Sequence, residues 1–172
     1  MAEMVPWFER KFTFDVPKGI FLNILERLRG TPARLEERLR ALPRDVLTRK
    51  QGSSWSIMEN AGHLFDLEPL WLERVDDFIK GSERLKTADL TNRKTHEAGH
   101  NSSALETILS SFRMARSKLV GKLEALNPAA FSKTALHPRL NAPMRLVDHI
   151  FFVAEHDDHH LARISMLMRS GD

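Results

Sequence analysis

Three histidines have a spacing that could bind a metal ion. His156 and His160 lie four residues apart in a long helical pattern near the C-terminus. Because four residues make about one helical turn, both imidazoles project from the same face and can hold one ion. His63 lies in a different predicted helix. Three neutral imidazoles from two helices would leave at least one coordination position open, which distinguishes a catalytic metal site from a structural one.

Each of these histidines also has a simpler interpretation. The chain has 8 histidines, and two of them one turn apart can arise by chance on a helix surface. His63 alone could be a hydrogen-bonded core residue. The position of the C-terminal pair favours the metal, because it shares a helix face with Phe152 and Val153. Such a face should point inward, where one ion would satisfy several buried imidazoles together.

The other histidines fit a shared ion less well. His159 points about 100° away around the helix, so we expect it to be exposed, although its spacing to His156 makes it a substitute ligand. His149 lies about 10 Å along the axis from His156, which places it in the pocket wall or the core. Three histidines lie in predicted loops and receive no role: His96, His100 and His137.

Nearby carboxylates could orient a ligand histidine by accepting a hydrogen bond from its free N–H. The candidates beside His63 are Glu59, about one turn before it, and Asp66, three residues after it. The last helix carries three more acids, of which one could act in this way while at least two should solvate the outer face: Glu155, Asp157 and Asp158.

Size and composition indicate one soluble domain. A chain of 172 residues, 42% hydrophobic and 28% charged, can bury one sizeable core, so we expect a single domain over residues 1–172 with residues 1–16 as an N-terminal extension. The net charge of +3 and the lack of a basic run argue against a nucleic-acid partner. Apolar runs are too short to cross a membrane, and the N-terminus does not resemble a secretory signal, so we expect a cytoplasmic location.

The chain has no cysteine. Disulfides, thiolate ligands and a cysteine nucleophile are therefore excluded. Any thiol that takes part in the chemistry must come from a second molecule.

Recurring apolar residues at three- and four-residue spacing predict amphipathic helices in the N-terminal part of the chain. The first runs over about 17–29 and breaks at Gly30. Thr31 can then cap a second segment, which stops at Pro43. Residues 44–54 form a connector.

Two capping boxes open the next two helices. The first consists of Ser56 and Glu59 and begins a helix that runs to about residue 80, with Pro69 expected to kink it. Residues 82–100 form a polar loop that could carry a short turn of helix. Ser103 and Glu106 form the second box, and their helix ends near residue 127.

A final helix is predicted over about 143–169, after a connector over 129–141. No alternating strand pattern of useful length appears anywhere. Long connected helices favour a bundle, so the predicted fold is all-α, a four-helix bundle with no sheet and with short extra helices or long loops.

Two segments resemble the DinB/YfiT-like superfamily. One is 55–64, which begins at Trp55 and Ser56 and contains His63; the other is 155–164, which contains His156 and His160. The resemblance implies a four-helix bundle that binds a divalent metal through three histidines, one after the Trp-Ser helix start and two in His-x-x-x-His. The matching positions are His63, His156 and His160. Imidazole ligands suit zinc or nickel first, with iron or other ions as alternatives.

The resemblance also implies classes of activity. Relatives include thiol-dependent transferases and isomerases that use mycothiol, bacillithiol or glutathione. The sequence therefore predicts a metal-dependent thiol S-transferase with a small-molecule thiol or another small substrate as partner. A metal-dependent hydrolase and a non-enzymatic metal-binding stress or interaction protein are the alternatives.

Arginines could bind the carboxylates of a small cosubstrate, and no general base stands out. The candidates lie on three predicted helices: Arg74, Arg113, Arg116 and Arg163. Relatives are often dimers, so a homodimer is a further expectation. The apolar segment 4–8 should pack over the bundle or against a second subunit.

Overall fold

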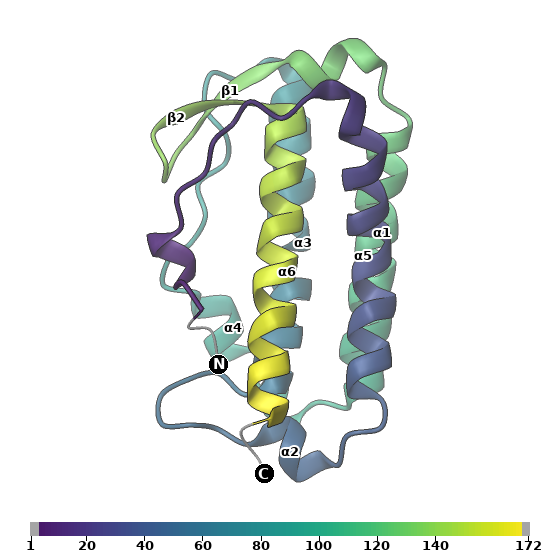
Figure 1. The fold of residues 1–172 in the computed structure, drawn as a ribbon, viewed down its shortest axis with the longest axis vertical. Helices are drawn as coiled ribbons and strands as arrows, with labels where there is room; N and C mark the ends of the chain where they lie inside the picture. The colour runs from purple at the N-terminus through teal and green to yellow at the C-terminus, as the bar shows by residue number, and fades with distance from the viewer. Residues whose placement is uncertain (1–3, 170–172) are drawn as a thin grey trace.

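Four long helices form the body of the molecule in a computed structural model that describes residues 4–169 (Figure 1). They are α1 (Phe21–Leu39), α3 (Ile57–Lys80), α5 (Leu105–Glu124) and α6 (Leu146–Arg169). Both α1 and α3 pack against α5 and α6, so α1 and α3 are diagonal partners. The all-α four-helix bundle predicted from the sequence is confirmed. The ends of the expected domain, 1–3 and 170–172, lie outside the described residues.

The chain crosses the length of the bundle between α3 and α5. Figure 1 shows α1 and α6 running in one direction and α3 and α5 in the other. The long segment 81–104 returns along the side of the bundle and carries α4 (Arg93–Glu97) and a 3-10 turn, η3 (His100–Ser102). The predicted short turn of helix in this loop is confirmed. A further short helix, α2 (Arg44–Thr48), lies in the predicted connector.

The N-terminus of α3 forms as the sequence predicts. The Ser56 hydroxyl accepts a hydrogen bond from the Glu59 N–H at 3.1 Å, and the Glu59 carboxylate accepts one from the Ser56 N–H at 2.8 Å. Gly81 ends the helix with a φ of 74°, a conformation that glycine adopts without strain. The second predicted capping box is wrong, because Ala104 precedes α5 and no side chain caps its first turn.

The predicted break at Gly30 is also wrong. Helix α1 continues through Gly30 and Pro32 to Leu39. A proline removes the helical hydrogen bond to the carbonyl four residues earlier, here that of Leu28. The Arg116 guanidinium on α5 donates to that carbonyl at 3.0 Å. A side chain distant in the sequence therefore satisfies the group that Pro32 leaves free.

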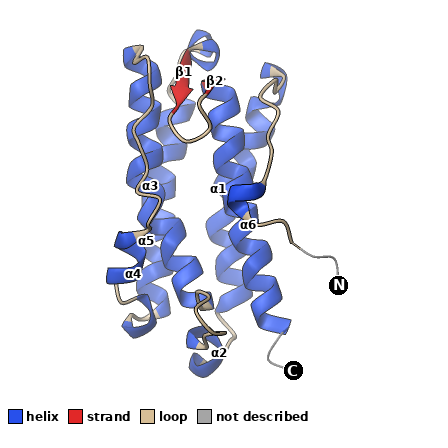
Figure 2. Ribbon diagram, turned by 90° about the vertical axis from the view of Figure 1, so that its left-hand side faces the viewer, coloured by secondary structure: helices blue, strands red, loops and turns tan. Residues whose placement is uncertain are grey.

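A two-stranded hairpin lies at one end of the bundle, at the opposite end from α2 (Figure 2). Strand β1 (Thr134–His137) pairs antiparallel with β2 (Ala142–Arg145). The expectation of no sheet is therefore wrong, because strands of four residues are too short to produce a readable alternation. Helix α6 begins at Leu146 rather than near residue 143, since β2 occupies the residues before it.

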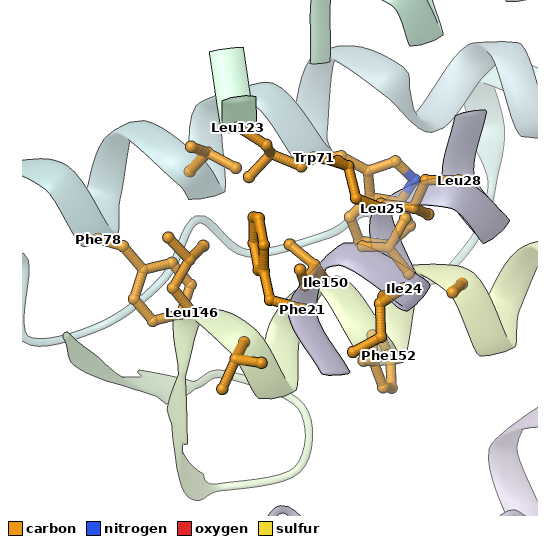
Figure 3. Packing of buried hydrophobic residues seen from close by; sticks show 14 of the residues in the cluster. Phe21, Ile24, Leu25, Leu28, Trp71, Phe78, Leu123, Leu146, Ile150 and Phe152 are labelled. Atoms are coloured by element: carbon orange, nitrogen blue, oxygen red, sulfur yellow. The ribbon is translucent and has the colours of Figure 1, made fainter. Parts of the chain in front are cut away.

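Two apolar clusters fill the interior. The cluster near the hairpin contains Trp71 and Phe152, which Figure 3 labels among its members. The cluster near α2 contains Leu64 and Leu161. On α6, the segment between Phe152 and Leu161 passes from one cluster to the other and carries His156 and His160; on α3, His63 lies beside Leu64, at the edge of the second cluster. Within residues 4–169, none of the helices has the length and apolar character needed to cross a membrane.

Candidate metal centre

The three histidines singled out in the sequence meet between α3 and α6. His63 from α3 faces His156 and His160 from α6, with ring centroids 5.4 and 4.8 Å away, and the α6 pair is 4.6 Å apart. One ligand nitrogen from each ring lies within 4.8 Å of the other two. All three side chains are buried. The arrangement could hold one metal ion.

Asn60 determines which nitrogen of His160 is free. The Asn60 amide nitrogen donates to the carbonyl of Ser56 at 2.8 Å, which directs its side-chain oxygen toward His160. That oxygen is 2.9 Å from His160 Nδ1, so Nδ1 carries the proton and donates it. The lone pair of His160 Nε2 is then available to a metal.

Thr95 performs the same function for His63. Its hydroxyl donates to the Asp66 carboxylate at 2.9 Å and lies 2.9 Å from His63 Nδ1. Because the hydroxyl proton is directed to Asp66, the hydroxyl accepts from His63 Nδ1–H and leaves His63 Nε2 free. Asp66 also accepts a hydrogen bond from His100 at 2.8 Å. Asp66 therefore does not accept the His63 N–H itself, as the sequence predicted; it orients the Thr95 hydroxyl that does.

Within residues 4–169, no hydrogen bond from another type of residue orients the His156 ring, in contrast to the other two histidines. Its Nε2 lies 3.2 Å from His160 Nε2, and its Nδ1 is buried without a partner among the described residues. Two nitrogens bound to one tetrahedral ion at about 2.1 Å each would be separated by about 3.4 Å. The observed separation is therefore compatible with a shared ion. It is equally compatible with a single hydrogen bond from His156 to His160.

Burial keeps all three rings neutral at pH 7. Desolvation lowers the pKa of His63 to about 4, against a smaller opposing effect of Asp66. Desolvation also lowers the pKa values of His156 and His160 well below the ordinary value, and the neighbouring histidines add to the effect. Neutral imidazole is the form that binds a metal. Burial alone would raise the pKa of Asp66, but the hydrogen bonds from His100 and Thr95, together with the charges of His100 and Lys94, lower it, so the carboxylate stays ionised.

The triad opens onto a pocket of about 530 Å³. All three histidines line it, together with Trp55, whose ring centroid is 4.7 Å from that of His63. Apolar side chains from α3 and α6 form much of the remaining wall, among them Leu67, Trp71 and Phe152. The candidate ligands are thus reachable by a small molecule, although each side chain is itself buried.

The N-terminal segment covers one side of this pocket. Trp7 packs against Phe152 and His156, with ring centroids 5.0 Å away in each case, and the Arg10 guanidinium pairs with Glu155 at 2.5 Å. The same tryptophan lies 5.5 Å from His159. Residues 4–8 therefore pack over the bundle of their own chain, one of the two positions expected for them. His159 lines the pocket and is half-buried rather than exposed.

The remaining histidines have distinct positions. His149 is fully buried in the core between Trp71 and Phe78, as one of its two predicted positions requires. Of the three without a predicted role, two contact residues of the site: His96 on α4 packs on Trp55, and His100 bonds to Asp66. The third, His137, lies on β1 and lines the pocket.

The carboxylates of α6 do not orient the ligands. Glu155 and Asp158 form half-buried ion pairs with arginines of the N-terminal segment and α1. Asp157 is fully buried and pairs with Arg116, which also pairs with Glu68 at 2.6 Å. On α3, the Glu59 carboxylate is engaged in the capping box and with Lys50 rather than with His63.

The predicted carboxylate-binding arginines separate into two groups. Arg116 is held in the buried ion pairs, and Arg113 pairs with Glu36 on the exposed surface. Arg74 and Arg163 line the pocket. The sequence analysis did not identify Arg139, a third arginine of the pocket, or the orienting residues Asn60 and Thr95. Asn60 precedes His63 by three residues, a spacing that offered a signal, whereas Thr95 lies on the short helix α4, in a segment whose sequence shows no apolar period.

The comparisons with known proteins agree with the fold. The family model described as the DinB superfamily matches residues 27–164, and the chain belongs to this superfamily. Among curated protein sequences none matches. The structure is similar to that of "YfiT from Bacillus subtilis", called "a probable metal-dependent hydrolase with an unusual four-helix bundle topology", with a TM-score of 0.82 and 16% identity over 94% of this chain and 93% of the other.

A second similar structure is the mycothiol-dependent maleylpyruvate isomerase. The TM-score is 0.68 with 11% identity, over 89% of this chain and 63% of the isomerase. This chain therefore spans less than two thirds of the isomerase. A mutant of the same isomerase matches at a TM-score of 0.68 and 10% identity. At these identities the two proteins share a fold with this chain.

Proposed function

We propose that this protein binds one divalent metal ion through His63, His156 and His160. We further propose that it uses the ion as an enzyme of the thiol S-transferase type, acting with a low-molecular-weight thiol. The observation that carries the proposal is the convergence of three neutral imidazoles on the wall of an open pocket. A structural zinc site, by contrast, has four protein ligands.

The residues present fit a metal ion better than an empty polar core. Asn60 and Thr95 hold His160 and His63 with their Nε2 lone pairs directed inward, and no donor among the described residues faces His63 Nε2. The His63 Nε2 lone pair is therefore free to bind an ion. An ion bound there would favour the thiolate form of a thiol, or the hydroxide form of water. Zinc or nickel suits the imidazole set first, and iron is an alternative.

The protein's own residues would bind and shield the thiol. The apolar wall of Leu67, Trp71 and Phe152 can bury the body of a small molecule, and Trp7 covers the pocket from outside. Because the chain has no cysteine, the nucleophilic sulfur must come from that molecule. In the reaction a sulfur–carbon bond would form, the leaving group would depart with its electron pair, and the thiol proton would pass to solvent.

A thiol-conjugation screen tests the proposal. Protein stripped with a chelator is reloaded with zinc or nickel and mixed with a chloroaromatic electrophile and mycothiol, bacillithiol or glutathione. Turnover should need the metal, saturate with thiol, and show a pH limb below the free thiol pKa of about 8.5. His63→Ala should abolish it, whereas Arg113→Gln, a surface change, should not. Metal-independent background rates with every thiol would overturn the transferase assignment.

A metal-dependent hydrolase is the second candidate. The structural similarity to YfiT, which is called a probable metal-dependent hydrolase, favours it. The two candidates differ in one measurable respect, since hydrolysis of an ester or amide would require the metal but no thiol. If metal binds and neither activity appears, a non-enzymatic metal-binding role remains.

Two further expectations stay proposals. We propose that residues 1–172 form a single domain, because residues 7–14 of the extension pack on α6 of the same chain through Trp7, Phe12 and Phe14. A homodimer is a separate prediction. Light scattering on protein with and without residues 1–12 would measure the mass and show whether this segment contributes to association.

A further inference from the structure

The side chains that line the pocket carry an excess of positive charge. Three arginines line it, Arg74, Arg139 and Arg163, and Asp89 is the one acid among the described lining residues. The Asp89 carboxylate accepts hydrogen bonds from Thr91 and from the Arg93 backbone, within its own loop. Since the histidines are neutral, the arginines leave the pocket with an excess of positive charge.

Arg139 has no polar partner among the described residues. It lies in the turn between β1 and β2 and its guanidinium packs over the rings of Phe8 and Phe152, 5.2 and 5.9 Å from their centroids. Its Nη2 atom is buried and unpaired. A buried guanidinium N–H without an acceptor is costly, and such a group is suited to a carboxylate.

Arg74 is also a buried arginine without an acidic partner among the described residues. It is 1% exposed and forms no ion pair with any acid in residues 4–169. Its Nε donates to the Lys86 carbonyl at 2.9 Å, and its Nη1 lies 3.1 Å from His137 Nε2. The other ring nitrogen of His137 accepts from the Leu140 N–H at 3.2 Å. A neutral imidazole has one accepting nitrogen, so His137 cannot satisfy both donors.

The conflict at His137 leaves donor capacity on Arg74. Burial, with the charges of Arg74 and Arg139, lowers the pKa of His137 to about 3, so the ring is neutral at pH 7. If Nδ1 accepts from Leu140, then Nε2 bears the proton and Arg74 Nη1 has no acceptor. An anion beside both arginines would supply one.

Both arginines are close to the candidate metal centre. The Arg74 guanidinium lies 5.4 Å from the Trp71 ring, and that ring lies 5.6 Å from His156. The Arg139 guanidinium contacts Phe152, which packs on Trp7 beside the same histidine. Each arginine is therefore linked to His156 through aromatic rings of the pocket wall, along which a bound molecule could extend toward the triad.

We infer that Arg74 and Arg139 form an anion subsite that binds the carboxylate of a small molecule with an apolar body. The aromatic and aliphatic wall would contact the body, and the opposite end of the molecule would face the histidine triad. This inference rests on the proposed function for its catalytic meaning, because it names the ligand class of the same pocket. Its test is binding, which requires neither metal nor turnover.

The test compares two probes of nearly equal shape, phenylacetate and phenylacetamide, by calorimetric titration of metal-free protein that has been stripped with a chelator and then dialysed to remove it. The carboxylate should bind at least about tenfold more tightly, since charged hydrogen bonds are stronger than neutral ones. Arg139→Met keeps an apolar stem over Phe8 and should remove the preference. Arg139→Lys should restore part of it, and Arg113→Gln on the outer surface should leave it unchanged.

Equal affinity for the two probes, or an unchanged preference in Arg139→Met, would overturn the subsite. Arg139 is half-buried, so this variant can be checked for an unaltered helical spectrum before the titration. Arg74→Lys is a second variant, which keeps the positive charge. It should weaken the binding of phenylacetate by a smaller factor than Arg139→Met does. If the carboxylate preference is present but no thiol-dependent turnover is found, the subsite stands and the proposed reaction fails.

A metal-loaded arm identifies which substrate carries the carboxylate. Mercaptophenylacetate and phenylacetate are titrated into protein with and without zinc. Zinc-dependent tightening of the thiol alone would assign the carboxylate to the thiol cosubstrate. Equal affinity of the two acids in the loaded protein would assign it to the second substrate. Either result supports the subsite, since both require the carboxylate to bind.

Discussion

The side-chain oxygen of Asn60 lies 2.9 Å from His160 Nδ1, across the contact between α3 and α6. This hydrogen bond determines which ring nitrogen is protonated. Residues that orient a ligand histidine change metal affinity by about 10- to 100-fold when they are removed. We expect Asn60→Leu to weaken zinc affinity by about that factor in a chelator-competition titration.

Asn60→Asp is the matched control, because a carboxylate at this position can still accept from His160. It should retain most of the affinity. If the leucine and aspartate variants bind zinc equally well, the hydrogen bond does not orient His160.

The second prediction concerns the close contact between Gly62 and His100. A Cβ added at Gly62 would lie 2.3 Å from the His100 ring, which is far below van der Waals contact. Gly62→Ala must displace His100 and weaken its bond to Asp66, so we expect a loss of about 1–3 kcal/mol in the free energy of unfolding. Urea unfolding measures it.

Gly121 provides the control for this substitution, because it lies inside α5 with nothing within 4 Å of an added Cβ. Gly121→Ala should stabilise the protein by about 0.4–1 kcal/mol through helix propensity and reduced chain entropy. Equal effects of the two substitutions would contradict the packing argument.

The third prediction separates a buried ion pair from an exposed one. Arg116 is 1% exposed and pairs with Glu68 and Asp157, which are themselves buried. Arg116→Leu leaves two buried carboxylates without their partner and should cost about 3–5 kcal/mol. Arg113→Leu removes an exposed, solvent-screened pair with Glu36 and should change the free energy of unfolding far less. A similar cost for both variants in urea unfolding would refute the assignment of Arg116 to the core.

The fourth prediction concerns pH and His149. Desolvation lowers the pKa of His149 well below 6.5, with smaller effects of Arg74 and His137. As the pH falls below 6.5, His149 becomes protonated in the unfolded chain but stays neutral in the folded chain. The free energy of unfolding is therefore not reduced by His149 above pH 6.5, and it decreases progressively as the pH falls toward the folded pKa of this residue.

Urea unfolding of the metal-free protein at pH 7 and pH 5 measures this effect. His149→Phe, in the apolar surroundings of Trp71 and Phe78, should reduce the difference in unfolding free energy between the two pH values. His96→Gln, at an exposed position, is the comparison. A pH dependence that His149→Phe leaves intact would show that His149 does not contribute.

The sequence predicts most of the long helices of this fold. It does not predict the features that depend on contacts between residues far apart in the chain. The period of α3 and its capping box are local signals, as is the one-turn spacing of His156 and His160. The continuity of α1 past Pro32 depends on Arg116, which is 84 positions further along the chain. No local pattern could show that contact.

The residues of the candidate site also fall into those with a local sequence signal and those without one. The three histidines were predictable because helical spacing places them on faces that also carry apolar residues. Thr95 and Arg139 were not, since each lies in a connecting segment whose path is determined by tertiary packing. The short hairpin that positions Arg139 has strands of four residues, too few to show a period.

The central claim is that three histidines bind one ion, and a zinc titration of purified, chelator-stripped protein tests it most directly. We predict one ion per chain, with affinity lowered by orders of magnitude in His63→Ala, His156→Ala and His160→Ala and little changed in His159→Ala. The helical spectrum of each variant should be retained, because the two apolar clusters remain. Failure of the unaltered protein to bind zinc, nickel or iron, or equal losses in His159→Ala and His160→Ala, would contradict the account.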